Sequence, residues 1–189
     1  MVSLAELWAP IALSGVGVFV LSFFAWMVLP HHRKDWVALP DEGAFFSALK
    51  DLGMKPGEYM FPWCHGVEKA EMMERYAAGP WGTFYLLDKK PNFGRNLGVT
   101  FLFDVVVALL AGYVASISLQ AGADGLRVFR VVSVCAFMGH CLGSFPHDVF
   151  TGRRIGPMGA TFADGFVYSL ITGGIFAWLW PDAAAAVTV

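Results

Sequence analysis

The chain has 189 residues and a formal net charge of −2, and 57% of its residues are hydrophobic against 15% charged. Such a charge balance provides no basic field, so we exclude nucleic acid as a partner. The mean hydropathy of +0.57 is typical instead of a polytopic membrane protein whose solvent is the lipid bilayer.

Four apolar segments have the length of a membrane-spanning helix, which needs about 20 residues at a rise of about 1.5 Å each. They comprise residues 7–29, 97–118, 126–146 and 162–180. The first is expected to be a retained anchor, because the basic pair Arg33-Lys34 follows the apolar run and no basic residue precedes it. The sequence therefore predicts an all-α membrane protein, a bundle of four transmembrane helices.

Between the first two spans lies one long polar segment, residues 31–96. Its patterns of apolar, β-branched and turn-forming residues predict a helix at 41–53, a strand at 58–63, a helix at 67–78 and a strand at 83–88. We expect a small α+β insertion that packs against the bundle or the membrane surface. The chain is thus predicted to divide into residues 1–30 with the first helix, residues 31–96 as a cytoplasmic insertion, and residues 97–189 with helices two to four.

Basic residues near the span ends predict the orientation. Most of them flank the insertion or follow the third span: Arg33, Lys34, Lys89, Lys90, Arg95, Arg153 and Arg154. The other side has Arg127 and Arg130. Because positive charge is retained in the cytoplasm, residues 31–96 and 147–161 are expected to be cytoplasmic and both termini outside.

Small residues recur at every fourth position on three of the predicted spans. The series are Ala108, Gly112 and Ser116; Cys135, Gly139 and Gly143; and Gly165, Ser169 and Gly173. Each series forms a ridge on one helix face where two backbones approach closely. We interpret these ridges as packing seams within the bundle or between protomers.

Ionisable residues inside the predicted spans form the most specific candidate site in the sequence. Asp104 and His140 are expected at similar depth on neighbouring helices, and Asp164 and Tyr168 lie one turn apart on the fourth span. A charged group in hydrocarbon costs about 2.5–3.5 kcal/mol on insertion scales, so it usually has a partner. We predict a direct Asp104–His140 pair, either as a proton-relay or cation site or as a hydrogen bond that fixes helix register. Asp164 is alternatively a helix N-cap at the interface.

The other histidines and one cysteine are weaker candidates for a metal or haem site at the cytoplasmic boundary. They are His31, His32, Cys64, His65 and His147. Their spacing matches no CxxC, HxxxH or CxxCH motif. The simpler interpretation of the His31–Lys34 segment is a polar stop at the lipid headgroups, so no cofactor is predicted.

Three segments resemble a family of small, uncharacterised bacterial inner-membrane proteins with four spans and one long cytoplasmic loop. They are Leu-Pro-His-His-Arg-Lys-Asp-Trp at 29–36 with Leu-Pro-Asp-Glu at 39–42, Gly-Glu-Tyr-Met-Phe-Pro at 57–62, and residues 164–181. The resemblance implies a location in the bacterial inner membrane. It implies no catalytic residue.

The leading functional interpretation is a non-enzymatic accessory or assembly component of a membrane complex, with no catalytic residue predicted. One alternative is a small transporter or proton-coupled carrier that uses the Asp104–His140 layer. Since four spans seldom enclose a pathway alone, we expect a homo-oligomer or a larger membrane complex as partner. The other alternative is a haem- or metal-binding redox component that uses the boundary histidines.

Overall fold

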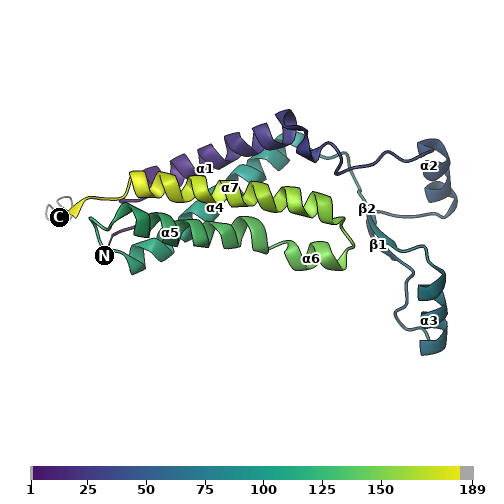
Figure 1. Ribbon diagram of the computed structural model, residues 1–189. Helices are drawn as coiled ribbons and strands as arrows, with labels where there is room; N and C mark the ends of the chain where they lie inside the picture. Colours follow the sequence, from purple (N-terminus) through teal and green to yellow (C-terminus); the bar gives the residue numbers. More distant parts are fainter. Residues whose placement is uncertain (1, 184–189) are drawn as a thin grey trace. The chain divides into compact units, whose positions relative to one another are not determined.

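The computed structural model describes residues 2–183 and is mostly helical (Figure 1). The elements in chain order are α1 (Trp8–Phe23), the π-helical turn η1 (Phe24–Val28), the 3-10 turn η2 (Pro30–His32), α2 (Glu42–Asp51), β1 (Gly57–Phe61), α3 (Lys69–Ala78), β2 (Gly82–Leu86), α4 (Phe93–Ser118), α5 (Gly125–Phe137), the π-helical turn η3 (Met138–Leu142), α6 (Phe145–Phe150) and α7 (Ile155–Trp178). They form two compact units. The first contains the chain up to Asp35, Phe93–Pro146 and the chain from Arg154; the second contains Trp36–Asn92 and His147–Arg153.

Four helices of the described chain are long and apolar enough to cross a membrane, as the sequence predicts. They are Trp8–Val28, Phe93–Ser118, Gly125–Phe150 and Ile155–Trp178. Only 22–28% of their most apolar windows is buried inside the chain. An apolar surface of this extent is stable against lipid and unfavourable against water, which supports a membrane protein.

The fourth of these helices begins earlier than predicted, at Ile155 instead of residue 162. The seven additional residues are not apolar enough to extend the predicted span, but they are compatible with a helix. Pro157 occupies the first turn, where its missing N–H removes no intrahelical hydrogen bond. The N-cap is Arg154, so the alternative prediction of Asp164 as an N-cap is wrong.

In the first unit the four long helices pack side by side (Figure 1). α7 contacts α5 and α1, and α4 contacts α1 and α5. Glycine allows the closest approaches: a Cβ on Gly173 would lie 2.0 Å from Ser133 Oγ, and one on Gly165 would lie 2.9 Å from the His140 carbonyl oxygen. The buried core includes Leu7, Val128, Val132 and Phe176.

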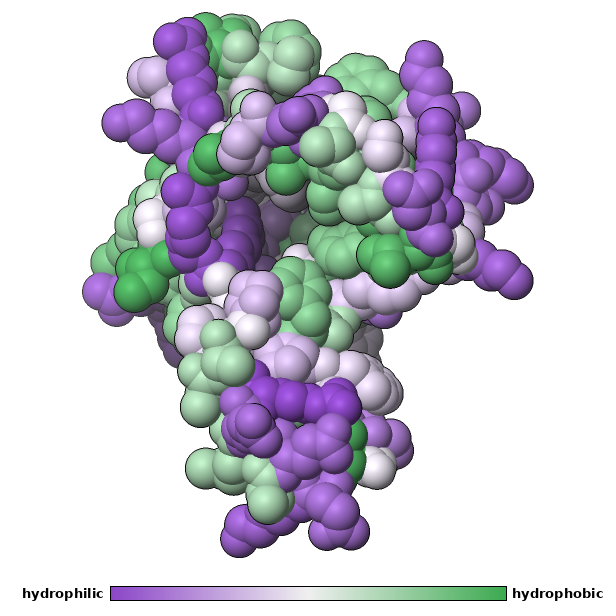
Figure 2. All heavy atoms as spheres, turned by 90° about the vertical axis from the view of Figure 1, so that its right-hand side faces the viewer, coloured by the Kyte–Doolittle hydropathy of each residue, from purple (hydrophilic) through white to green (hydrophobic). Residues whose placement is uncertain are grey.

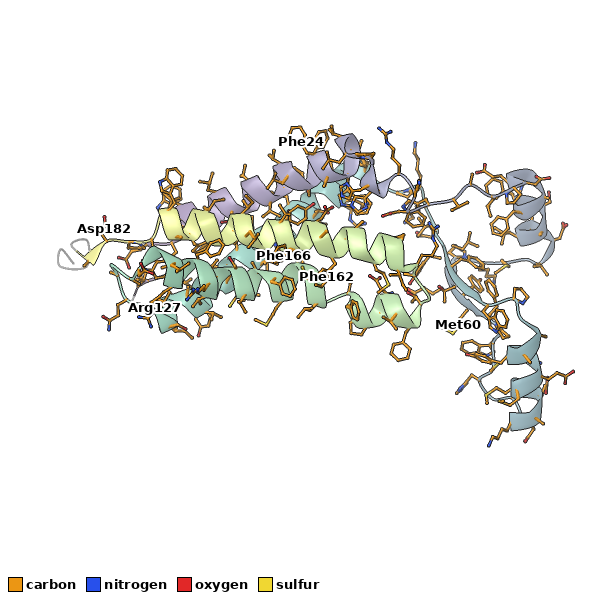
Figure 3. The ribbon with its side chains drawn as sticks, viewed as in Figure 1. Phe24, Met60, Arg127, Phe162, Phe166 and Asp182 are labelled. Carbon is orange, nitrogen blue, oxygen red and sulfur yellow. The ribbon has the colours of Figure 1, made fainter. Side chains whose placement is uncertain are left out.

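Aromatic contacts reinforce the pair of α5 and α7. Phe162 and Phe166 of α7 (Figure 3) both contact Phe137 of α5, with ring centroids 5.4 and 6.2 Å from it and nearly perpendicular planes. These edge-to-face arrangements are the favoured ones for aromatic rings. These contacts hold α7 against α5 along residues 162–166, the segment that contains Asp164.

The second unit contains both strands and the two short helices that the sequence predicts for residues 41–88. β1 and β2 pair antiparallel, with Tyr59 opposite Phe84 and their rings stacked at 5.1 Å. α2 begins after Asp41, whose side chain accepts a hydrogen bond from the Ala44 N–H at 2.8 Å. α3 ends at Gly79, where φ is +61°. The face of the molecule drawn in Figure 2 shows hydrophilic and hydrophobic residues interleaved.

Residues 147–153 belong to the second unit and contact its strands. The Thr83 hydroxyl donates a hydrogen bond to the Thr151 carbonyl at 3.2 Å. The Tyr85 hydroxyl lies 3.3 Å from His147 Nε2. His147 therefore has a hydrogen-bond partner, Tyr85, within its own unit.

Candidate metal centre

The end of α1 presents two consecutive histidines to the fourth long helix. α1 continues into the π-helical turn η1, and Pro30 then opens the 3-10 turn η2, which contains His31 and His32. Leu29 before this proline is extended, with ψ of 148°, as expected for a residue that precedes proline. The chain thus leaves the helix sharply, and both imidazoles lie against α7.

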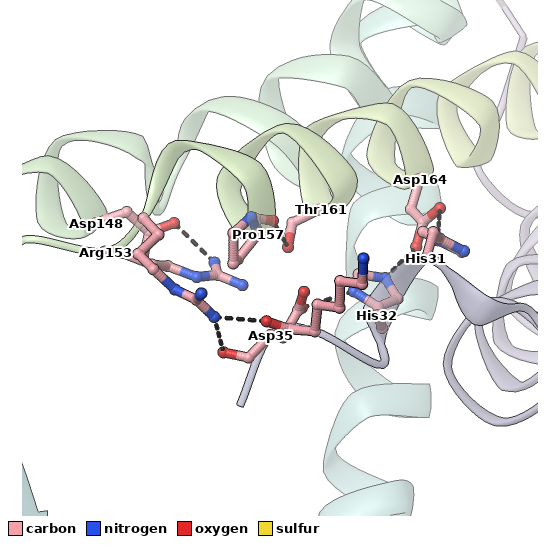
Figure 4. A network of polar contacts seen from close by, with 10 residues as sticks. His31, His32, Asp35, Asp148, Arg153, Pro157, Thr161 and Asp164 are labelled. Carbon is pink, nitrogen blue, oxygen red and sulfur yellow. Dashed lines mark hydrogen bonds and ion pairs between the residues drawn. The ribbon is translucent and has the colours of Figure 1, made fainter. Parts of the chain in front are cut away.

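Asp164 of α7 receives both histidines, one on each carboxylate oxygen (Figure 4). His31 Nε2 lies 2.9 Å from Oδ1, and His32 Nε2 lies 2.8 Å from Oδ2. One donor atom from each of the three residues lies within 4.8 Å of the other two. The three side chains therefore form one compact set of nitrogen and oxygen ligands.

Besides Asp164, two further side chains contact His32. Its Nδ1 lies 2.7 Å from Asp35 Oδ2, and the side chains of these two residues are 4% and 5% exposed. The indole of Trp26, in η1, stacks on the imidazole with ring centroids 3.8 Å apart and planes within 4°. A buried carboxylate and a stacked ring fix both the position and the rotation of the imidazole.

The N-terminal end of α7 anchors the turn that follows the histidines. The Arg154 guanidinium donates hydrogen bonds to the carbonyl oxygens of Lys34 and Asp35. Arg154 is also the N-cap residue of α7. One helix therefore supplies both the Asp164 ligand and the support for the loop that holds Asp35.

The hydrogen-bond pattern around His32 is compatible with that of a metal ligand. A neutral imidazole has one N–H, whereas His32 faces a carboxylate oxygen at each ring nitrogen. If Nδ1–H donates to Asp35, Nε2 has a lone pair for a cation. Histidines that bind metals usually donate their other N–H to a carboxylate in this way.

The donor spacing also fits a metal ion. In an octahedral site with bonds of about 2.1 Å, adjacent donor atoms lie about 3.0 Å apart, and in a tetrahedral site about 3.4 Å. The observed separations of 2.9 and 2.8 Å, each to a different oxygen of Asp164, have hydrogen-bond length and are also close to the octahedral value. Asp35 and Asp164 together provide two negative charges, which balance a divalent cation.

The structure rearranges the residues proposed from the sequence. Asp164 meets His31 and His32, which the sequence analysis assigned to a separate and weaker site. No hydrogen bond joins Asp104 and His140 among residues 2–183: Asp104 Oδ2 and His140 Nε2 are both buried without a partner. The direct pair predicted from the sequence is therefore not formed.

The remaining metal candidates lie in the second unit and have other neighbours. Cys64 Sγ lies 3.6 Å from the Pro62 carbonyl oxygen. His65 packs edge-on to Trp63 at 5.9 Å. Within the described part of the chain, His31, His32 and Asp164 form the one group of three such ligands.

Asp35 and Trp26 also belong to this site, although neither was predicted from the sequence. The spacing of Asp35, three residues after His32, was the available signal, because a carboxylate at that distance on a turn reaches an imidazole nitrogen. Trp26 gave no comparable signal, since a tryptophan at a span end is ordinary at a membrane interface.

Substituting Asp35→Asn is expected to reduce metal affinity by about 10–100-fold, because the outer carboxylate orients His32 and increases its basicity. Isothermal titration of the purified protein with Zn²⁺ measures the change. Asp51→Asn, at the C-terminal end of α2, is the matched control and should leave the affinity unchanged. Equal affinities for the Asp35 variant and the unsubstituted protein would contradict the assigned role.

Comparison with known proteins gave no match: no family, no curated protein and no solved structure is significantly similar to the chain.

Proposed function

We propose that this chain is a bacterial inner-membrane protein that binds one divalent first-row transition-metal ion through His31, His32 and Asp164. The observation that supports the proposal most directly is the convergence of two imidazole nitrogens and one carboxylate within 4.8 Å. The buried carboxylate of Asp35 behind His32 supports it independently. Metal binding is thus the most specific activity to which the geometry points.

The proposed topology has four membrane-spanning helices and a cytoplasmic α+β insertion. The two ends of the described chain and the turn between α4 and α5 lie at one end of the helical unit, since Trp180 Nε1 donates to the Gln120 carbonyl at 3.0 Å. Arg127 lies at this same end (Figure 3). Because the other end has more basic residues, the positive-inside rule makes that end cytoplasmic. The metal site then lies near the cytoplasmic boundary.

The ligand chemistry favours ions such as Zn²⁺, Fe²⁺, Mn²⁺ or Ni²⁺ over Mg²⁺ and Ca²⁺. Imidazole nitrogen suits the transition metals, whereas Mg²⁺ and Ca²⁺ prefer oxygen ligands. Three protein ligands leave coordination positions open, and two histidines with one carboxylate form the ligand set of many non-haem iron sites. The open positions would accept water or a small oxygen or nitrogen ligand.

Haem is a poorer fit to the same residues. Both Nε2 atoms are directed at Asp164, and the Trp26 indole covers one face of His32 at 3.8 Å. An axial ligand needs open space beyond its nitrogen for a porphyrin. The structure therefore favours a bare ion. An accessory role in a membrane complex is compatible with this proposal and stays a prediction.

The direct test is metal titration of the chelator-treated, full-length protein in lipid nanodiscs. We expect one Zn²⁺ or Mn²⁺ per chain to remain after gel filtration, measured by elemental analysis, and no comparable retention of Mg²⁺. Retention of no transition metal by the folded protein would overturn the proposal.

A further inference from the structure

Each of the four long helical segments contributes a buried polar atom that has no hydrogen-bond partner among residues 2–183. Four of these atoms are Ser14 Oγ of α1, Asp104 Oδ2 of α4, His140 Nε2 of η3 and Tyr168 Oη of α7. A fifth, Ser133 Oγ of α5, lies at the close contact with Gly173 and is not part of this group. Ser14 is 0% exposed and Asp104 is 5% exposed. None of the four belongs to the metal centre.

Close backbone contacts place these groups in one layer of the helical unit. A Cβ on Gly15, next to Ser14, would lie 2.5 Å from Val105 Cγ2, next to Asp104. The His140 and Tyr168 rings meet edge to face at 5.8 Å. The ring of Phe103, next to Asp104, meets the His140 ring edge to face at 5.8 Å. The layer thus joins α1, α4, η3 and α7 near the middle of the 26-residue helix α4.

Three other hydroxyl groups, in α4 and α7, form the hydrogen bond that is usual for a polar side chain in an apolar environment. Ser116, Ser169 and Thr172 each donate to a backbone carbonyl three or four residues earlier, at 2.6–2.9 Å. This local bond satisfies the hydroxyl without a second helix. The four groups of the layer lack such bonds, and a buried polar group left dry is costly.

The local backbone at His140 is unusual as well. His140 lies in the π-helical turn Met138–Leu142, which interrupts the third long helix. Single π-helical turns are rare and occur frequently at functional sites. The turn gives an independent reason to regard the layer as more than a packing defect.

We propose that Ser14, Asp104, His140 and Tyr168 form an internal site that binds water and at which Asp104 takes up and releases a proton. Water satisfies several polar groups at once, typically about three. In the proton step, a water-borne proton adds to a carboxylate oxygen of Asp104 to give the neutral acid, and returns to water in the reverse step. No other bond forms or breaks.

The polar groups that share the layer with Asp104 lie on three other segments. η3 presents His140, α7 presents Tyr168, and α1 presents the uncharged Ser14. Asp164, one turn from Tyr168, is paired with the two histidines. No cation neutralises Asp104 among the salt bridges of the described residues. The proposal goes beyond metal binding and does not depend on it.

The test is infrared difference spectroscopy between acidic and alkaline buffer, on the full-length protein in lipid nanodiscs with chelator present. We expect a carboxylic-acid carbonyl band that Asp104→Asn abolishes and that Tyr168→Phe shifts in frequency. Ser116→Ala is the control. Ser116 lies in α4, as Asp104 does, and its buried hydroxyl already has a backbone partner, so this substitution should leave the band unchanged. A spectrum of Asp104→Asn identical to that of the unsubstituted protein would overturn the proposal.

A stability measurement separates a hydrated site from a dry one and remains decisive if Asp104→Asn fails to fold. In a dry site, Tyr168→Phe removes an unpartnered hydroxyl and raises the melting temperature; in a hydrated site it breaks a water-mediated hydrogen bond and lowers it. We expect a fall of a few degrees, and a rise would overturn the proposal. Because no metal is present, neither result depends on the metal centre.

Discussion

Replacing His32 by alanine is expected to lower the affinity for Zn²⁺ or Mn²⁺ by at least about 100-fold. Loss of an outer-sphere group alone typically costs 10–100-fold, and His32 is a direct ligand in the proposed site. The substitution also removes the partner of Asp35 and the ring on which Trp26 stacks. Equilibrium titration in nanodiscs, with the amount of bound metal measured by elemental analysis, determines the change.

Two other histidines provide matched controls. His65 and His147 lie in the second unit and contact Trp63 and Tyr85, so their alanine variants should retain full affinity. A folded His32→Ala protein that binds the metal as tightly as the unsubstituted chain would show that the His–Asp cluster only joins η2 to α7. Its melting temperature, measured in parallel, distinguishes loss of a ligand from loss of the fold.

Replacing Gly173 by leucine is expected to separate α5 from α7 and to destabilise the helical unit by about 3 kcal/mol or more, as overpacking at a tight contact does. A Cβ at this position would lie 2.0 Å from Ser133 Oγ and 2.9 Å from the Phe129 carbonyl oxygen. The second of these is backbone and cannot move aside without moving α5. Thermal unfolding in detergent, followed by intrinsic tryptophan fluorescence, measures the effect.

The neighbouring glycine is the control for this experiment. A Cβ on Gly174 would meet no atom within 4 Å, so Gly174→Leu should be tolerated and should gain up to about 1 kcal/mol of helix propensity. In a Gly173→Ala background, adding Ser133→Ala should recover part of the lost stability because it removes the nearest atom. Equal melting temperatures for the two leucine variants would contradict the packing described here.

Local rules were sufficient for the long helices, the two strands and the two short helices of the insertion, apart from the start of α7. A helix in lipid must satisfy its backbone hydrogen bonds internally and must be apolar over about 20 residues, and both requirements can be read along the sequence. Asp41 before α2 and Gly79 after α3 are likewise local signals. The start of α7 was misplaced because hydropathy identifies where a segment becomes apolar, whereas a helix continues through residues such as Gly156 and Pro157.

The candidate site required the tertiary structure. His31 and Asp164 are 133 positions apart in the sequence, and no periodicity connects the end of one helix with the interior of another. The sequence did supply the composition of the site, since His31 and His32 were weak metal candidates and Asp164 belonged to the predicted polar cluster. Which partner each one meets depends on how the glycine and serine seams of α1, α4, α5 and α7 come together. That packing is set by contacts between distant segments, so the sequence determined the helices and the available ligands, and the tertiary structure alone decided that two histidines and one aspartate share a site.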